Sequence, residues 1–245
     1  MGAKIAANFR QNNICSKVEC ERLLSFTNNF GPLFIIGSVG ISLLGNSTIG
    51  FLLLFTHLLA SISVGFLFRF WKRNDTEKFI SDSSNVKNKI IKLSSLGEVI
   101  GNSIKNSINT ILMIGGFVVL FSVILSILKT SNLLNISCYF MKPVFELFRI
   151  PQAFYSGIIS GVIELTNGLN IICHIPEKNI SINIIIASFI LGLGGISVLL
   201  QVWSCISKTD LSITPYILGK ILQACFSALY TWIFLNIVPF FNFNL

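Results

Sequence analysis

The residues best suited to chemistry are polar side chains that interrupt strongly apolar stretches of the sequence. Glu164 opens the segment ELTNGLNII, in which Thr166 and Asn167 add a hydroxyl and an amide. A carboxylate within an apolar span costs on the order of 3 kcal/mol and normally faces a cavity or a partner. We therefore expect this cluster to bind a polar solute, or to exchange a proton or cation through Glu164. A hydrogen-bonded cluster between helices is the alternative.

Further polar residues lie in similar apolar surroundings. Lys220 could line a cavity or extend to a lipid–water interface, and His57 could contribute to a site or be a packed, neutral histidine. Ser197 and Gln201 are four residues apart, so on a continuous helix they share one face and could address one cavity or make an interhelical hydrogen bond. The candidate binding or coupling residues are Thr27, Asn28, Ser42, His57, Glu164, Thr166, Asn167, Ser197, Gln201 and Lys220.

The composition places these residues in a membrane protein. Hydrophobic residues make up 53% of the chain, charged residues 11%, and the mean hydropathy is +0.77, outside the range of soluble globular proteins. Helices of about 20 apolar residues cross a bilayer. Such spans are expected at 48–70, 108–128, 182–207 and 216–238, with shorter, polar-interrupted ones at 31–44 and 153–172. The predicted fold class is all-α, a polytopic helical membrane protein.

The formal net charge of +8 is concentrated between two spans. Eight of the 18 Lys and Arg residues fall between Arg69 and Lys105. Basic residues mark cytoplasmic loops, so residues 71–107 are predicted to form one. No recognisable module accompanies this charge, which argues against nucleic acid as a partner. The six cysteines show no CxxC pair and no zinc-like spacing, so neither disulfides nor a metal site is expected.

Two segments of the chain resemble each other. FIIGSVGISLL at 34–44 aligns with FILGLGGISVL at 189–199 with seven identities in eleven positions, and SFTN and ELTN precede the two copies. Many secondary transporters are built from such repeats, in which Gly-interrupted helices meet near the bilayer midplane. Close packing of neighbouring helices is the alternative role for the glycines. The glycines predicted to lie in broken or re-entrant helices are Gly37, Gly40, Gly192, Gly194 and Gly195.

The repeat divides the chain into predicted parts. They are a polar or amphipathic N-terminal segment (1–24), a first, incomplete repeat (25–70), the basic loop (71–107) and a second repeat (108–245). Near 132–150 an interfacial helix is expected, because Lys142, Glu146 and Arg149 form a charged stripe opposite apolar residues. A full span precedes only the second repeat, so we expect longer relatives to have an N-terminal portion that this chain lacks.

Four stretches of the sequence resemble a known family. They are ERLLSFTNNFGPLFIIGSVG, SIKNSINTILMIGGFVVLFSVILSIL, GVIELTNGL and GGISVLLQVWSCISKTDLSITPYILGKILQACFSALYTWIF. The chain is similar to YlbJ-type sporulation integral membrane proteins from about Glu21 onward, and the last stretch is the most specific. The resemblance implies a Gate, or nucleoside-recognition, domain like that of concentrative nucleoside transporters. It also implies a protein of the outer forespore membrane, made in the mother cell, that moves dipicolinic acid. It implies no set of binding residues.

These observations predict a transporter of a small polar or anionic solute, with dipicolinic acid first. A nucleoside or ion transporter and a non-transporting membrane scaffold are the alternatives. The expected partners are the solute, the lipid bilayer and other sporulation membrane proteins. The sequence has no G-x-S-x-G, HExxH or phosphate-loop motif, so neither enzyme activity nor a cofactor is expected. The expected donors to an anion are helix N-termini at the breaks together with Asn28, Asn167, Ser197, Gln201 and Lys220.

Overall fold

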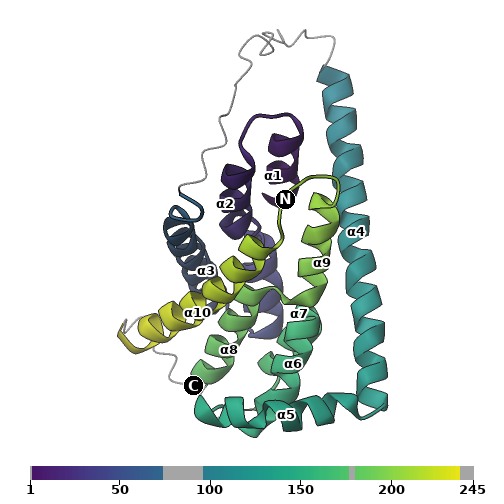
Figure 1. Ribbon diagram of the computed structural model, residues 1–245. Helices are drawn as coiled ribbons and strands as arrows, with labels where there is room; N and C mark the ends of the chain where they lie inside the picture. Colours follow the sequence, from purple (N-terminus) through teal and green to yellow (C-terminus); the bar gives the residue numbers. More distant parts are fainter. Residues whose placement is uncertain (1, 74–95, 177–179, 238–245) are drawn as a thin grey trace.

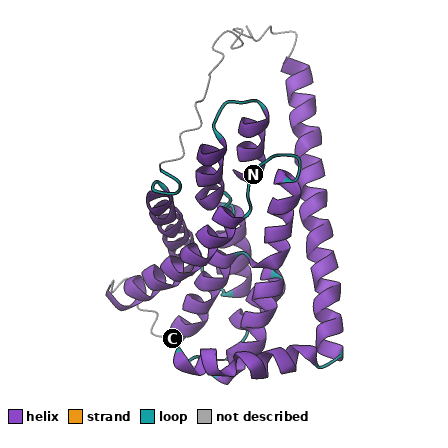
Figure 2. Cartoon of the chain, in the orientation of Figure 1, coloured by secondary structure: helices purple, strands orange, loops and turns teal. Residues whose placement is uncertain are grey.

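The computed structural model describes residues 2–73, 96–176 and 180–237 (Figure 1). These residues form helices and connecting loops without a strand (Figure 2), which confirms the predicted all-α membrane fold. In chain order the helices are α1 (Gly2–Gln11), α2 (Lys17–Thr27), the π-helix η1 (Leu33–Leu43), α3 (Ser47–Phe68), α4 (Leu96–Thr130), α5 (Leu133–Leu147), the short 3₁₀ turn η4 (Gln152–Phe154), α6 (Tyr155–Ile163), α7 (Leu165–Cys173), α8 (Ile180–Leu193), α9 (Gly195–Ile206) and α10 (Thr214–Ile237).

Four segments are long and apolar enough to cross a membrane. They are Ser47–Phe68, Gly97–Thr130, Ile180–Ile206 and Thr214–Ile237, close to the four main spans expected from the sequence. The second begins one residue into α4 and well before the predicted start at 108, so the last part of the predicted basic loop is helical. Nothing in this polar stretch stops a helix, and its Ser103 and Ser107 hydroxyls bond back to carbonyls four residues earlier. Residues 74–95 and 238 of the predicted loop and last span lie outside the described residues.

The predicted short span at 153–172 is a helical hairpin rather than one crossing. Helices α6 and α7 have nine residues each and rise about 13 Å, roughly half of a bilayer's hydrocarbon core of about 30 Å. They run antiparallel, with Gly157 against Ile172 and Gly161 against Gly168. Glu164 forms the turn in extended backbone geometry, with φ −141° and ψ 119°. The segment therefore enters the bundle and returns toward the side from which it came.

The second glycine-rich copy contains a helix break, whereas the first does not. Helix α8 ends at Leu193, and Gly194 and Gly195 have φ of 80° and 76° before α9 continues. The first copy is one uninterrupted π-helix, so the prediction of a break at Gly37 and Gly40 is wrong. At the constant offset of the alignment, Val39 stands where the second copy has Gly194, and a β-branched residue does not adopt a positive φ readily. The predicted pair of broken helices is therefore not confirmed.

Two of the predicted hinge glycines serve close packing instead. A Cβ on Gly40 would overlap the backbone of Gly50 in α3, and one on Gly192 would come within 2.8 Å of the backbone nitrogen of Ala224 in α10. The main hydrophobic core lies beside these contacts and is built by η1, α3 and α6 to α8. These glycines thus let helices approach within the core, as small residues do in membrane bundles.

Helices α1 and α2 are built into the bundle at the end of Figure 1 opposite α5. Arg10 on α1 forms a bidentate pair with Asp210 in the α9–α10 loop at 2.8 and 2.7 Å. This guanidinium holds the pKa of the Asp210 carboxyl below its usual value. On α2 the buried Glu21 accepts hydrogen bonds from the Trp71 indole and the Ser212 backbone. The predicted polar or amphipathic N-terminal segment thus ties together the end of α3 and the start of α10.

Helices α4 and α5 form the outer edge of the bundle. Figure 1 shows α4 along one side and α5 lying across the end of the structure. Most apolar side chains of α4 are exposed, as expected for a helix that faces lipid. Helix α5 coincides with the expected interfacial helix, and its Lys142 and Glu146 form an exposed ion pair at 3.6 Å.

The hairpin crossing predicts a sharp difference between two glycine substitutions. In Gly168→Ala the added Cβ overlaps the backbone of Gly161, so the hairpin must open, at a cost of about 1–3 kcal/mol. Gly115→Ala on α4 is the matched control, because its Cβ meets nothing. We expect thermal unfolding in detergent to occur several degrees lower for Gly168→Ala alone. Equal midpoints would contradict the antiparallel packing of α6 on α7.

Candidate functional site

A small cavity lies where the α6–α7 hairpin, the α8–α9 break and α10 come together. Its volume is about 170 Å³. Apolar side chains form most of its wall, and Lys220 is the charged residue among those that line it. The lining residues are Val162, Leu193, Gly195, Ile196, Leu199, Tyr216, Ile217, Lys220 and Ile221.

Three non-helical stretches of backbone meet beside this cavity. A Cβ built on Gly195 would lie 2.8 Å from the Gly161 carbonyl oxygen and 3.5 Å from the Leu165 nitrogen, so the α8–α9 break touches the hairpin turn. A Cβ on Gly194 would lie 3.9 Å from the Phe30 ring, in the loop between α2 and η1. Irregular backbone at membrane depth is tolerated only where protein or a water-filled cavity receives its polar groups. The place where these three stretches meet is therefore the part of the bundle that departs most from regular helical structure.

Lys220 is buried within the bundle rather than extended to the interface. Its residue is 4% exposed, and its Nζ donates to Gln223 Oε1 at 2.9 Å. The same nitrogen lies 5.9 Å from the centre of the Tyr216 ring, within range of a cation–π interaction. Among the described residues, no carboxylate forms a salt bridge with Lys220. It is a buried amine whose observed partners are neutral groups, and it lines the cavity.

Gln223 connects Lys220 to two other elements. Its Nε2 donates to Asn29 Oδ1 at 2.8 Å and lies 3.4 Å from His57 Nε2 on α3. Asn29 in turn donates to the Phe26 carbonyl at 2.7 Å and to the Ser61 hydroxyl at 2.8 Å. The predicted residues His57 and Lys220 are therefore brought together, by a glutamine and an asparagine that the sequence analysis did not select.

A cluster of four buried hydroxyls continues the polar face of α10. Thr231 donates to Ser188 on α8 at 2.7 Å and lies 3.0 Å from the Thr56 hydroxyl on α3, and Ser188 and Ser227 are 2.7 Å apart. With Lys220 and Gln223, the polar residues of α10 recur every three or four positions and so occupy one face. This periodicity inside an apolar span was the signal that could have identified them from the sequence.

Glu164 forms a second polar cluster at the hairpin turn. Its carboxylate caps α7 and accepts from the backbone and hydroxyl of Thr166 at 3.0 and 2.6 Å. It also accepts from the backbone and side-chain amide of Asn167 at 2.8 and 2.7 Å. The Asn167 amide further donates to Ser122 on α4 at 2.8 Å. Glu164 is buried but does not line the cavity, and its bonds stay within α7. Only Asn167 makes a hydrogen bond between helices, as the alternative expected.

The other selected residues divide by position. Gln201 donates to Ser197 at 3.4 Å, and both are buried in α9. Asn28 follows the last residue of α2, next to Asn29. Thr27 donates to the Leu23 carbonyl of its own helix. Ser42 is exposed and donates to the Gly37 carbonyl. The last two hydroxyls therefore lie outside both polar clusters.

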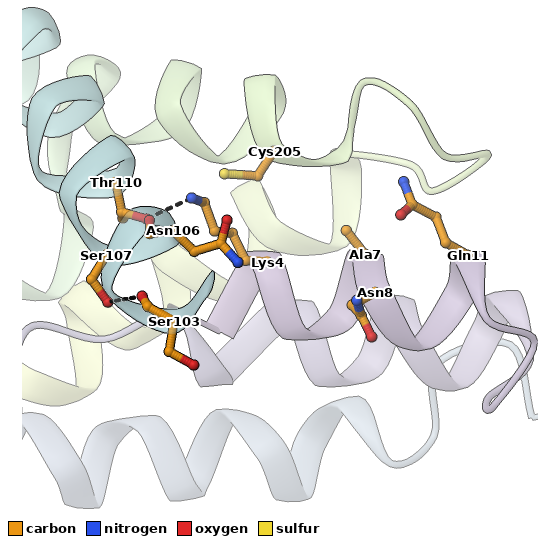
Figure 3. A pocket seen from close by; sticks show the side chains of 9 residues that line it. All are labelled: Lys4, Ala7, Asn8, Gln11, Ser103, Asn106, Ser107, Thr110 and Cys205. Atoms are coloured by element: carbon orange, nitrogen blue, oxygen red, sulfur yellow. Dashed lines mark hydrogen bonds between the residues drawn. The ribbon is translucent and has the colours of Figure 1, made fainter. Parts of the chain in front are cut away.

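A wider pocket lies between α1, α4 and α9, away from the break (Figure 3). Its volume is about 500 Å³, and its lining is rich in hydroxyls and amides. Lys4 reaches across it from α1 to donate to the Thr110 hydroxyl of α4 at 2.6 Å. None of the residues selected from the sequence lines this pocket, so we base the site on the smaller cavity.

The fold and the site define a class: a polytopic helical membrane protein in which interrupted helices surround a small cavity. The chain is 34% identical over 243 residues to the sporulation integral membrane protein YlbJ of Bacillus subtilis strain 168. This match confirms the resemblance to YlbJ-type sporulation integral membrane proteins over the matched region. The match covers 94% of the chain and 59% of that relative, so the chain spans about three fifths of its length. No family model and no solved structure matches the chain.

The capping geometry of Glu164 predicts a local loss of stability. Glu164→Ala removes the acceptor for two backbone N–H groups of α7, a change that costs about 0.5–2 kcal/mol at a helix N-terminus. We expect faster hydrogen exchange at Thr166 and Asn167 and a lower unfolding midpoint. Glu146→Ala on α5 is the control, because that carboxylate is exposed and makes only a surface ion pair. Unchanged exchange in the first turn of α7 would exclude the capping role.

Proposed function

We propose that this chain forms the solute pathway of a membrane transporter that acts in spore maturation, with dipicolinic acid as the solute. The observation that carries the proposal is the buried ammonium of Lys220 in a cavity bounded by the broken helix α8–α9. Discontinuous helices around a central site are the usual architecture of secondary transporters. A buried, unneutralised cation is costly and marks a functional site by default.

The charge of the cavity favours an anion. Lys220 contributes a full positive charge, and the first residues of α9, Gly195 and Ile196, also line the cavity. The N-terminal turn of a helix carries a partial positive charge and N–H groups without an intrahelical acceptor. At α7 the corresponding groups are occupied by Glu164. The start of α9 is therefore a helix terminus at the cavity that can face a solute carboxylate.

The wall of the cavity favours a solute with an apolar body. Dipicolinic acid presents an aromatic ring to the aliphatic side chains and its carboxylates to Lys220. The volume of about 170 Å³ is comparable to an apolar cavity of roughly 150 Å³ that holds benzene. A nucleoside would bring several ribose hydroxyls, each needing a hydrogen-bond partner, and Lys220 and Tyr216 are the polar side chains in this wall. The site thus supports an aromatic anion over a nucleoside.

The relative supports the physiological setting of the proposal. B. subtilis YlbJ is named a sporulation integral membrane protein, and the described part of the present chain has four segments able to cross a membrane. We extend this setting to the outer forespore membrane of the mother cell, where a dipicolinate transporter would act, and to a Gate-type domain. Other sporulation membrane proteins are the expected partners. A non-transporting scaffold would give no reason for the buried cation.

The proposal predicts that Lys220→Met abolishes transport without unfolding the protein. Methionine keeps the length of the side chain and removes a buried charge that has no ionic partner, so stability should be retained or increased. In proteoliposomes, uptake of labelled dipicolinate should fall at least about tenfold, the effect of losing 1.4 kcal/mol of binding.

Lys142→Met is the matched control, since that lysine is exposed on α5. It should leave uptake unchanged. Labelled uridine, tested in parallel, should not enter at a comparable rate. Uptake of dipicolinate by Lys220→Met at the wild-type rate would refute the assignment of the site, and preferential uptake of uridine would favour the nucleoside alternative.

A further inference from the structure

Two basic side chains lie close together in the interior, on α3 and α10. His57 is 0% exposed and Lys220 is 4% exposed. Gln223 bridges them, with its Oε1 2.9 Å from Lys220 Nζ and its Nε2 3.4 Å from His57 Nε2. Among the described residues neither base forms an ion pair with a carboxylate.

The direction of these hydrogen bonds is set by a backbone carbonyl. Asn29 Nδ2 donates to the Phe26 carbonyl, which can only accept, so Asn29 Oδ1 faces Gln223. This oxygen requires an N–H from Gln223, which leaves Gln223 Oε1 as the acceptor for Lys220. The Gln223 amide nitrogen therefore also faces His57 Nε2, and that ring nitrogen acts as an acceptor. The proton of the neutral imidazole is thereby placed on Nδ1.

His57 Nδ1 is the unsatisfied end of this network. It is buried and has no hydrogen-bond partner among the described residues. Buried polar groups are nearly always paired, and an exception calls for a functional or ligand-related explanation. A histidine held neutral beside a lysine, with one ring nitrogen already an acceptor, can take up a proton when its electrostatic surroundings change.

The elements packed around the pair bring no free acid to it. Glu21 on α2 is bonded to Trp71 and Ser212 and lies 3.6 Å from the Lys72 ammonium. Glu164 is bonded to its own helix. Helices α8 and η1 carry no ionisable side chain. The remaining ionisable residues on the packed elements are Lys17, Glu19, Cys20 and Arg22 on α2, and Tyr216, Cys225 and Tyr230 on α10.

We propose that His57 and Lys220 form a proton-coupling site, in which one proton from solution binds His57 Nε2 as a dianionic solute enters the cavity. Two neighbouring cations in a dry interior disfavour each other, so the empty site holds a single charge, on Lys220. An entering dianion provides the missing counter-charge. Its two negative charges are then balanced by Lys220 and protonated His57. Because binding effects are reciprocal, the proton strengthens anion binding to the same degree.

Protonation also changes the network itself. Once Nε2 carries a proton, it can no longer accept from Gln223, so the contact between α3 and α10 at this point is released. The charge state of His57 is thereby linked to the helix that carries Lys220. This inference rests on the proposed function, names its coupling ion and assigns that role to His57 rather than to Glu164.

The test uses the full chain in proteoliposomes, with labelled dipicolinate and the membrane potential clamped at zero. For one proton per solute, an inward gradient of one pH unit should raise accumulation about tenfold and make the external medium more alkaline. His57→Gln should lose this response, and its exchange of labelled for unlabelled dipicolinate should be slower than in the wild type, because the second positive charge is gone. His174→Gln is the matched control, because that histidine is exposed at the end of α7, and it should behave as the wild type does.

A second variant covers the case in which His57→Gln does not assemble. Gln223→Glu places a carboxylate between the two bases and so provides the counter-charge in the empty site, which should also abolish the response to the gradient. If the wild type exchanges dipicolinate but ignores the gradient, the coupling is refuted and the transport proposal stands. If the wild type does not exchange dipicolinate, the coupling and the transport proposal are both refuted. A full gradient response in both variants would overturn the assignment to His57.

Discussion

The structure depends on one constraint: in hydrocarbon, each backbone N–H and C=O needs a partner within the protein. Regular helices meet this requirement by themselves, so every departure from a helix must be compensated. At the hairpin turn the Glu164 carboxylate accepts the free N–H groups of α7. At the α8–α9 break, Gly195 lies against the Gly161 carbonyl. The hairpin turn and the α8–α9 break lie next to each other, and the cavity lined by Lys220 lies beside them.

The same constraint explains why the polar residues of α10 face inward. Leu218, Ile221 and Trp232 are exposed on this helix, while the face that carries Gln223 and Ser227 is buried. Lipid offers no hydrogen bonds, so these polar groups must find their partners on α3, on α8 and in the loop after α2. The hydrogen bonds that result fix how α10 crosses its neighbours. A polar interior is therefore an organising element of this bundle as well as a candidate site.

The sequence predicted the spans well, because the length of an apolar stretch decides whether it can cross a bilayer. The structure places Gly194 between α8 and α9. The match at seven of eleven positions hid Val39, which stands at the corresponding position of the first copy. His57 and Lys220 were selected singly, but their connection through Gln223 and Asn29 depends on how three elements pack. Glu164 was expected to face a cavity, yet its donors lie two and three residues further along its own chain. Such capping is invisible until the helix boundary is known.

The break at Gly194 has a mechanical consequence. Helix α8 packs mainly on α10, α3 and α7, and hydrogen bonds through Ser188 hold it to α10, whereas α9 packs on α1, α4 and α6. The first half of this membrane-crossing segment, α8, thus belongs to one group of packed helices, and its second half, α9, belongs to another group. Two glycines in a left-handed conformation join the two halves. The cavity lies along this seam, between α9 and α10. A small rotation of one group against the other would change its width while leaving every helix intact.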